Sequence, residues 1–404
     1  MRLVRVQSVR DDMELARNIP SPVLGSQPLL RRGVHLTTAL GERLAALDVR
    51  AVWIQDDLGA GIDPIEPLPE KVRRSTELAV SRCLNQARAV AADLSSLTSQ
   101  IVGMLEHAAA GIMEALAECP EAVLAFDDLA SADSYTYSHS VRVATLGLLL
   151  GQRIDRVEGW VDWRGDRRFD RTEQRMTQLA VGLLIHDIGK ISIPESILNK
   201  TGKLTPEEWE LIKTHPQAGA SMLAADRVSP MTIAIVRDHH ERWDGMGYAR
   251  GLREEEINPF ARIAAVADVY DAVTADRPFK PGRPPHVGVN VILEGAGTQF
   301  DERVVEHLKR VAMPYPVGYT ITLPDGRPGV VAGVDPEEPE YPVIRYRDRS
   351  AALAEVAMHV VGGEVVAGYH SFGPLHLAPP ESGPPVPPFA DLPSSDLAPP
   401  ELAA

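Results

Sequence analysis

The chain has 404 residues and a formal net charge of −15, and 44% of its residues are hydrophobic while 5% are aromatic. This length predicts two or three globular domains, and the acidic charge excludes broad binding to nucleic-acid polymers but not a small phosphorylated ligand at a metal site. The two cysteines match no disulfide framework, and signal-peptide and membrane-span patterns are absent from the sequence, so we expect a cytoplasmic protein without membrane insertion.

The first 119 residues predict a small α/β module and then connecting helices. In residues 1–66, LVRV and VRAVWIQD are typical of strands, and residues 28–47 of a helical stretch. Residues 67–119 carry a seam spaced alternately by three and four: Val80, Cys83, Ala87, Val90, Leu94, Leu97, Ile101, Met104 and Ala108. Such a seam supports either a coiled-coil homodimer or an amphipathic helix packed on its own chain.

The remainder predicts a mainly α region followed by a β-rich one. Residues 120–312 alternate apolar helical stretches with polar loops, and the charged, Trp-containing segment 154–174 is expected to be a surface loop. Residues 313–372 contain short β-like runs and the hairpin signal Asp325-Gly326, which predict a small β-rich module. The Pro-rich acidic tail, residues 373–404, is expected to be disordered.

Histidines and aspartates in the helical region form a candidate metal site. LAVGLLIHDIGK predicts an apolar helix that ends in His186-Asp187 and is stopped by Gly189, and Asp268 lies in the otherwise apolar run IAAVADVY. A buried carboxylate needs a partner, and a metal ion can serve as one. The candidate ligands are His139, His186, Asp187, His215, His239, His240 and Asp268.

Imidazole and carboxylate ligands suit first-row ions, with iron and manganese favoured, and seven ligands are too many for one ion but natural for two. Simpler readings stand beside this one. His139 alone could be a hydrogen-bonded core residue, Asp268 could pair with Arg262, and Lys190 could be a solvated lysine at a helix end.

His186-Asp187 within this array resembles the HD phosphohydrolase superfamily. ILNKTGKLTPEEWELIKTHPQAG, HHERWDGMGY and ADVYDAVTADRPFK are similar to segments of its HD-GYP branch of cyclic di-GMP phosphodiesterases, over residues 129–311. The resemblance implies an HD-type helical bundle with two metal ions. His139, His186, Asp187 and Asp268 would hold one ion, and Asp187 would bridge to a second ion held by His215, His239 and His240.

The resemblance also implies roles for three cations. Lys190 would meet a substrate phosphate and act with Asp187 in catalysis, while Arg277 and Lys280 would face the dinucleotide phosphates. Some family members bind a third ion through a Glu where this chain has Tyr135, so two ions are expected. Ala249 stands where the GYP signature has Pro, and Phe279 where Tyr is expected.

The implied activity is hydrolysis of cyclic di-GMP to pGpG, with GMP as a further product, in bacterial second-messenger signalling. Two alternatives stay open: a cyclic di-GMP sensor with little turnover, and a hydrolase of another cyclic dinucleotide. A homodimer and signalling partners that contact the Gly245–Tyr248 loop are also expected.

Overall fold

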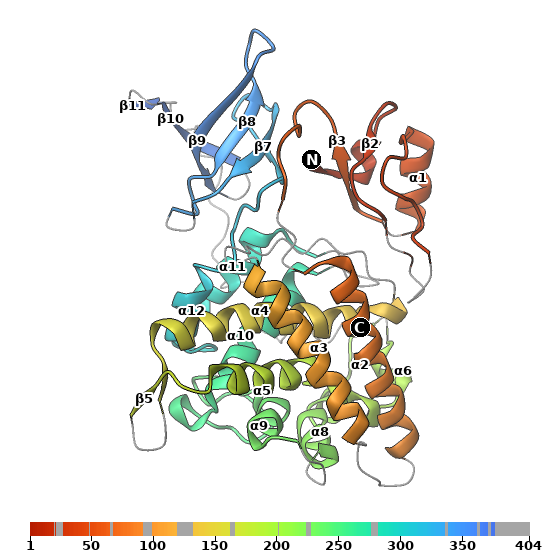
Figure 1. Cartoon of the computed structure of the whole chain (residues 1–404), viewed down its shortest axis with the longest axis vertical. Helices are drawn as coiled ribbons and strands as arrows, with labels where there is room; N and C mark the ends of the chain where they lie inside the picture. Colours follow the sequence, from red (N-terminus) through yellow and green to blue (C-terminus); the bar gives the residue numbers. More distant parts are fainter. Residues whose placement is uncertain are drawn as a thin grey trace.

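The computed structural model describes residues 1–19, 21, 27–47, 49–64, 68–91, 99–118, 132–161, 166–200, 202–223, 228–275, 282–335, 338–361, 364–370 and 373–375. Figure 1 shows a helical body with two smaller modules side by side at one end. Cys119 and residues 376–404, the bulk of the tail that was predicted to be disordered, lie outside the described residues.

The helical body contains one large apolar cluster, formed by buried residues between Leu68 and Ala312. Its helices are α2 (Glu70–Ala91), α3 (Ser99–Glu118), α4 (Ala132–Val157), α5 (Thr172–Leu184), α6 (Glu195–Leu198), α7 (Pro206–Ile212), α8 (His215–Leu223), α9 (Pro230–Asp238), α10 (Pro259–Thr274), α11 (Pro285–Glu294) and α12 (Glu302–Leu308). Two 3₁₀ turns, η2 (Ile188–Ser192) and η3 (Glu254–Glu256), connect them. The mainly α prediction is confirmed.

Glycines allow the central helices to approach closely. A Cβ on Gly182 of α5 would lie 3.0 Å from Ile235 Cβ of α9, and one on Gly147 of α4 would collide with the Leu183 side chain of α5. The close packing of α4 and α9 against α5 therefore requires positions without a side chain. These three helices carry or directly precede five of the predicted ligands.

The predicted seam packs within the chain. Its described positions lie on two helices, α2 and α3, that pack against each other and against α4 and α5 (Figure 1). Val80, Cys83, Ala87, Ile101 and Ala108 are buried in the large apolar cluster. The second alternative, an amphipathic helix packed on its own chain, is therefore the correct one for these positions. Leu94 and Leu97, and the side chain of Val90, lie outside the described residues.

The N-terminal module is a three-stranded antiparallel sheet covered by one helix. Strands β1 (Arg2–Arg5) and β3 (Ala51–Gln55) coincide with the predicted strands, and β2 (Glu14–Leu15) completes the sheet beside β3. The helical stretch is shorter than predicted: α1 spans Thr38–Ala46, because Thr37 caps it by accepting a hydrogen bond from the Leu40 amide. A 3₁₀ turn, η1 (Val6–Ser8), follows β1.

The C-terminal module is a small closed sheet. Strands β6 (Thr320–Thr322), β7 (Pro328–Gly333), β8 (Val343–Arg347), β9 (Leu353–Val361), β10 (Glu364–His370) and β11 (Gly373–Leu375) confirm the β-rich prediction. The expected hairpin joins β6 to β7, with Gly326 at φ +81°. β10 pairs with β9 on one side and with β6 on the other, so the sheet closes on itself.

The two modules contact each other although they lie at opposite ends of the chain. The Leu3 amide donates to Gly318 O (2.8 Å), and Thr320 Oγ1 donates to Leu3 O (2.8 Å). Leu58 and Ile62 pack with Val330 in a shared apolar cluster. Hydrogen bonds and apolar packing thus join the first strand of the chain to the start of the closed sheet.

The predicted surface loop is partly a hairpin. Strands β4 (Trp160–Val161) and β5 (Arg167–Arg168) pair between α4 and α5, and residues 162–165 lie outside the description. Within the described segments, none of the helices combines the length and hydropathy needed to span a bilayer.

Candidate metal centre

His186 and Asp187 lie in the turn between α5 and η2, at the centre of the site. The apolar helix ends at Leu184, three residues earlier than predicted, and the chain then tightens into the 3₁₀ turn. His186 Nε2 lies 3.4 Å from Asp187 Oδ2. Both residues are buried, with exposed fractions of 1% and 7%.

Gly189 brings this turn against α8. A Cβ at Gly189 would overlap the His215 carbonyl oxygen and lie 2.6 Å from the Gly219 nitrogen, so only glycine fits. This close approach places His215 Nε2, at the first residue of α8, 3.3 Å from Asp187 Oδ1. Gly189 was predicted to stop the helix, but the helix ends at Leu184 and Gly189 lies inside η2, where it joins two ligand-bearing segments.

His239 and His240 follow the last residue of α9. The helix begins at Pro230, where the Ser229 hydroxyl accepts from the Met231 amide. Beyond its end, His239 Nε2 lies 3.8 Å from Asp187 Oδ1 and 3.4 Å from His215 Nε2. The His239 and His240 rings lie 3.9 Å apart between centroids. A helix terminus thus delivers consecutive imidazoles to one place.

The loop that carries the GYP-like signature folds over His240. The Tyr248 ring lies 4.8 Å from the His240 ring, and the Tyr248 amide donates to His240 O (3.2 Å). A Cβ at Gly247 would lie 2.6 Å from the same carbonyl oxygen. The buried Glu241 carboxylate accepts hydrogen bonds from the Arg250 and Leu252 amides and so holds the far side of the loop. The Tyr248–Ala249 peptide bond is cis.

His139 and Asp268 complete the cluster from two long helices, α4 and α10. His139 Nε2 lies 3.2 Å from Asp268 Oδ1 and 3.8 Å from Asp187 Oδ2. His186 Nε2 lies 3.8 Å from the same Asp268 oxygen. All seven predicted ligands are therefore buried side chains that meet around Asp187.

Four of the five histidines are held so that Nε2 faces the other ligands. His186 Nδ1 donates to Leu183 O (2.7 Å), His215 Nδ1 to Ile212 O (2.8 Å) and His239 Nδ1 to Val236 O (3.0 Å). His139 Nδ1 donates instead to the Asp271 carboxylate (2.7 Å). A hydrogen bond of this kind fixes the imidazole tautomer and orients the ring for a metal ion.

Burial and neighbouring charge set the protonation states. Burial lowers the pKa of His239 well below 6.5, with His240 adding to the effect, and lowers the pKa of His215 despite the nearby Asp187 carboxylate. Burial disfavours an ionised Asp187, but the Lys190 ammonium and then His186 outweigh it and hold the Asp187 pKa well below 3.8. Near pH 7 the imidazoles of His215 and His239 are thus neutral and Asp187 is a carboxylate, the forms that bind metal ions.

The donor set fits divalent metal ions. Ligand atoms of Asp187, His215, His239 and His240 lie within 4.8 Å of one another, and so do those of His139, His186 and Asp187. Among the described residues, His186 Nε2 and Asp187 Oδ1 are buried without a hydrogen-bond partner. Because orphaned buried polar atoms are costly, their position in the cluster points to ions that complete them.

Of the three basic residues predicted to bind substrate phosphates, the structure describes Lys190. Lys190 Nζ lies 2.9 Å from Asp187 Oδ2, with a quarter of its side chain exposed, so it pairs with a predicted ligand instead of being fully solvated. Arg277, Phe279, Lys280 and the side chain of Tyr135 lie outside the described residues.

One simpler reading is wrong, and the other, that His139 is a hydrogen-bonded core residue, agrees with the structure. Arg262 pairs with Asp301 (3.0 Å) rather than with Asp268, because six residues along a helix place two side chains about 120° apart. His139 does have a hydrogen bond in the core, but its second nitrogen faces two carboxylates. Asp271 and Arg142, which hold His139, were missed, although Asp271 lies three residues after Asp268 on the same buried helix.

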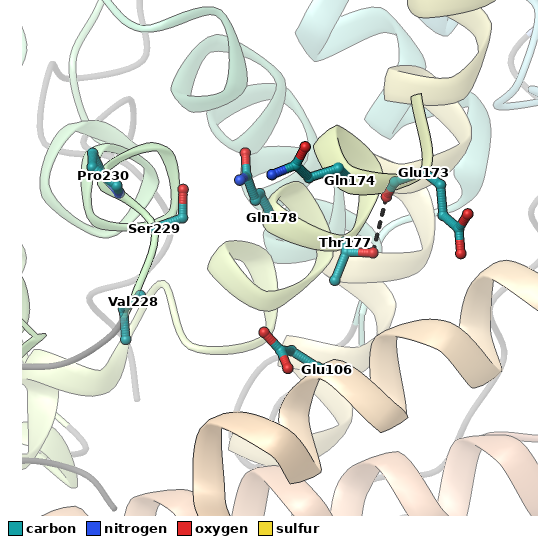
Figure 2. A pocket seen from close by; sticks show the side chains of 8 residues that line it. All are labelled: Glu106, Glu173, Gln174, Thr177, Gln178, Val228, Ser229 and Pro230. Carbon is teal, nitrogen blue, oxygen red and sulfur yellow. Dashed lines mark hydrogen bonds between the residues drawn. The ribbon is translucent and has the colours of Figure 1, made fainter. Parts of the chain in front are cut away.

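A separate cleft of about 680 Å³ contains no predicted ligand. It lies between α3, α5 and the start of α9 and is lined by Glu106, Glu173, Gln174, Thr177, Gln178, Val228, Ser229 and Pro230 (Figure 2). Thr177 Oγ1 in its wall donates to Glu173 O (2.9 Å). The described residues that line this cleft include no group of His, Cys, Asp and Glu side chains close enough together to hold a metal ion.

Known proteins resemble the chain across the helical body. A family model described as an HD domain matches residues 149–304. A cyclic di-GMP phosphodiesterase of Pseudomonas aeruginosa is 34% identical over 330 residues, which cover 75% of each chain. A second cyclic di-GMP phosphodiesterase, from Thermotoga maritima, is 39% identical over 37% of this chain and 41% of its own length.

A third relative carries a different substrate in its name. The 3′3′-cGAMP-specific phosphodiesterase 3 of Vibrio cholerae is 32% identical over 51% of this chain and 42% of its own length. The HD-domain match and the extensive relationship to the Pseudomonas protein agree with the His-Asp turn, the paired histidines and the GYP-like loop. The chain belongs to the HD-GYP family of the HD phosphohydrolase superfamily.

Proposed function

We propose that the chain is a metal-dependent phosphodiesterase that hydrolyses cyclic di-GMP to pGpG. The observation that carries this proposal is the 34% identity with a cyclic di-GMP phosphodiesterase across three quarters of both chains. The buried cluster of imidazoles and carboxylates supports it, because metal-assisted hydrolysis of a phosphodiester needs such ligands.

Two ions, iron or manganese, would be shared between the halves of the cluster. His139, His186 and Asp268 would hold the first, and His215, His239 and His240 the second, with Asp187 bridging them. The two oxygens of Asp187 support this assignment, because Oδ2 faces His139 and His186 while Oδ1 faces His215 and His239. Bound ions would supply Lewis acidity toward the phosphate and activate water for attack.

The chain's own groups would orient the substrate. Lys190 combines a contact to Asp187 with partial exposure, so its ammonium can reach a phosphate from the edge of the cluster. Tyr248 covers His240 and would limit access on that side. Arg277 and Lys280 are proposed to bind the remaining phosphate charge, as the family resemblance implies.

The decisive experiment is turnover by anaerobically purified full-length protein supplied with Mn²⁺ or Fe²⁺. Chromatography should show conversion of cyclic di-GMP to pGpG, with GMP as a further product. Asp301→Asn, which alters a buried ion pair outside the cluster, should remain active, whereas Asp187→Asn should not. Recovery of intact cyclic di-GMP from metal-loaded protein would contradict the proposal and favour a sensor.

The same assay separates the alternative substrate. Parallel reactions with 3′3′-cGAMP are required because one relative is named for that dinucleotide. We propose that cyclic di-GMP is hydrolysed faster, as the most extensive of the three reported alignments, that with the Pseudomonas protein, indicates. Faster hydrolysis of 3′3′-cGAMP would reassign the substrate while leaving the metal chemistry in place.

Assembly and partners form a further part of the proposal. Met246, at the tip of the Gly245–Tyr248 loop, is 79% exposed, which supports contact of this loop with a protein partner. We still propose a homodimer, but with an interface other than the seam. Separate apolar clusters support the proposed N-terminal module (1–66) and β-rich module (313–372). One cluster spans the proposed connecting helices (67–119) and catalytic domain (120–312), so that boundary stays a prediction, as does the tail (373–404).

A further inference from the structure

Three site histidines use the ends of helices to fix their tautomers. The carbonyls that accept from His186, His215 and His239 belong to Leu183, Ile212 and Val236, all in the last turn of a helix. The last four carbonyls of a helix have no intrahelical partner and are therefore available to a side chain.

His139 has no such carbonyl. It lies inside α4, which continues to Val157, so the surrounding carbonyls are used by the helix itself. The Asp271 carboxylate takes their place: it accepts from His139 Nδ1 at 2.7 Å, and both residues are buried. Since an ionised carboxylate can only accept, the hydrogen must lie on Nδ1, and Nε2 is left to face Asp268 and Asp187.

Arg142 holds the Asp271 carboxylate in turn. Its Nε donates to Oδ1 (2.5 Å) and its Nη2 to Oδ2 (3.2 Å), and the guanidinium is one helical turn from His139 on α4. A two-point contact fixes the carboxylate plane and compensates its buried charge. The contacts thus run from the Arg142 guanidinium to the Asp271 carboxylate, then to the His139 imidazole, and from there to the ligand cluster.

We propose that Asp271, held by Arg142, is a positioning residue that orients His139 and strengthens its binding to the first metal ion. This inference rests on the proposed two-ion function. One face of α10 would then both bind the ion and orient a ligand, because Asp268 would coordinate the ion directly while Asp271 would position His139. Loss of an outer carboxylate of this kind weakens metal affinity by about 10- to 100-fold.

The test is a Mn²⁺ titration of metal-free full-length protein by calorimetry. In Asp271→Asn, the amide oxygen can accept from His139 Nδ1 only if the amide NH₂ group faces the Arg142 guanidinium. Both of those groups are hydrogen-bond donors, so the two-point contact with Arg142 is lost. We expect one of the two Mn²⁺ ions to bind about 10- to 100-fold more weakly and the other to be unchanged. Wild-type affinity for both ions in this variant would overturn the proposal.

Two further variants separate positioning from folding. Asp301→Asn disturbs a buried Arg–Asp pair of the same kind, with Arg262, and should lower the melting temperature without changing Mn²⁺ affinity. Asp271→Leu with Arg142→Met replaces the ion pair by apolar groups and should recover thermal stability but not Mn²⁺ affinity. Recovery of both in the double variant would show that Asp271 acts only through stability.

The outcome is distinguishable from failure of the proposed function. Wild-type protein that binds two Mn²⁺ ions without hydrolysing cyclic di-GMP would contradict the activity but leave the comparison with Asp271→Asn valid. Wild-type protein that binds a single ion would contradict the two-ion assignment. In that case, unchanged affinity in Asp271→Asn would overturn the positioning role as well.

Discussion

The two halves of the ligand cluster are built from different kinds of structure. His215, His239 and His240 come from the ends of short helices, and a glycine contact and a covering loop bring them together. His139 and Asp268 come from the interiors of two long helices, and an arginine–carboxylate pair aligns one of them. One half thus depends on local turns, the other combines the His186 turn with the packing of α4 against α10, and Asp187 contacts both.

The largest expected effect is loss of the residue that joins the halves. Asp187→Ala removes both carboxylate oxygens from the centre of the cluster, so we expect loss of both ions and a fall in kcat/KM of about a thousandfold or more. Metal content and turnover should be measured on the same preparation. A metal-loaded, active variant would show that the halves do not meet at Asp187.

Removing one ligand from each half should separate the ions. We expect Asp268→Asn and His240→Ala each to lower bound Mn²⁺ from about two ions to about one, with activity reduced by about 10²-fold or more. Elemental analysis after gel filtration gives the stoichiometry. Loss of both ions from either variant would mean that the halves bind metal cooperatively rather than separately.

Gly189 tests the half that depends on close backbone contact. Gly189→Ala should destabilise the protein by about 1–3 kcal/mol, because its Cβ would overlap the His215 carbonyl oxygen, and should weaken the ion on the His215 side. The matched control is Gly103→Ala on α3, where no atom lies within 4 Å of an added Cβ. That change should be neutral or stabilising in thermal melts.

The smallest effect is expected at a pair outside both halves. Glu158 accepts hydrogen bonds from Arg303 and from His307 (2.7 Å) and joins the end of α4 to α12. Burial opposes its ionisation, but these two partners lower its pKa below 4.5. A depressed carboxyl pKa stabilises the fold above the unfolded value, and this contribution is lost as pH falls through the folded value.

Glu158→Gln should therefore lower the melting temperature by about 1–3 °C near pH 7, with a difference that disappears as pH falls below about 4.5. Metal content near pH 7 should stay unchanged. A larger difference at low pH than at neutral pH would reverse the assigned sign of the pKa shift.

Sequence patterns predicted the ligands of both halves but not the contacts that orient them. The turn at His186, the pair His239-His240 and the role of Asp268 follow from apolar runs interrupted by ligand residues. The pairing of Asp271 with His139 depends on contact between helices far apart in sequence, which periodicity does not reveal. The seam shows the same limit, since its spacing fits both a dimer and the packing within this chain.

The strands at both ends were also predictable, because β-branched runs and Asp325-Gly326 are local signals. Their meeting was not, since the contact between Leu3 and Gly318 depends on where the helical body places the two ends. Backbone proximity of this kind is a property of the whole fold.

The contact between the two end modules limits how the protein can be shortened. A fragment that begins at α2 would uncover Val330 and its apolar neighbours, and a fragment that stops after α12 would uncover Leu58 and Ile62. Either truncation exposes apolar side chains that the contact between the modules buries, and an exposed apolar patch favours aggregation. A truncated protein intended for crystallisation or assay should therefore retain both ends or lose both together.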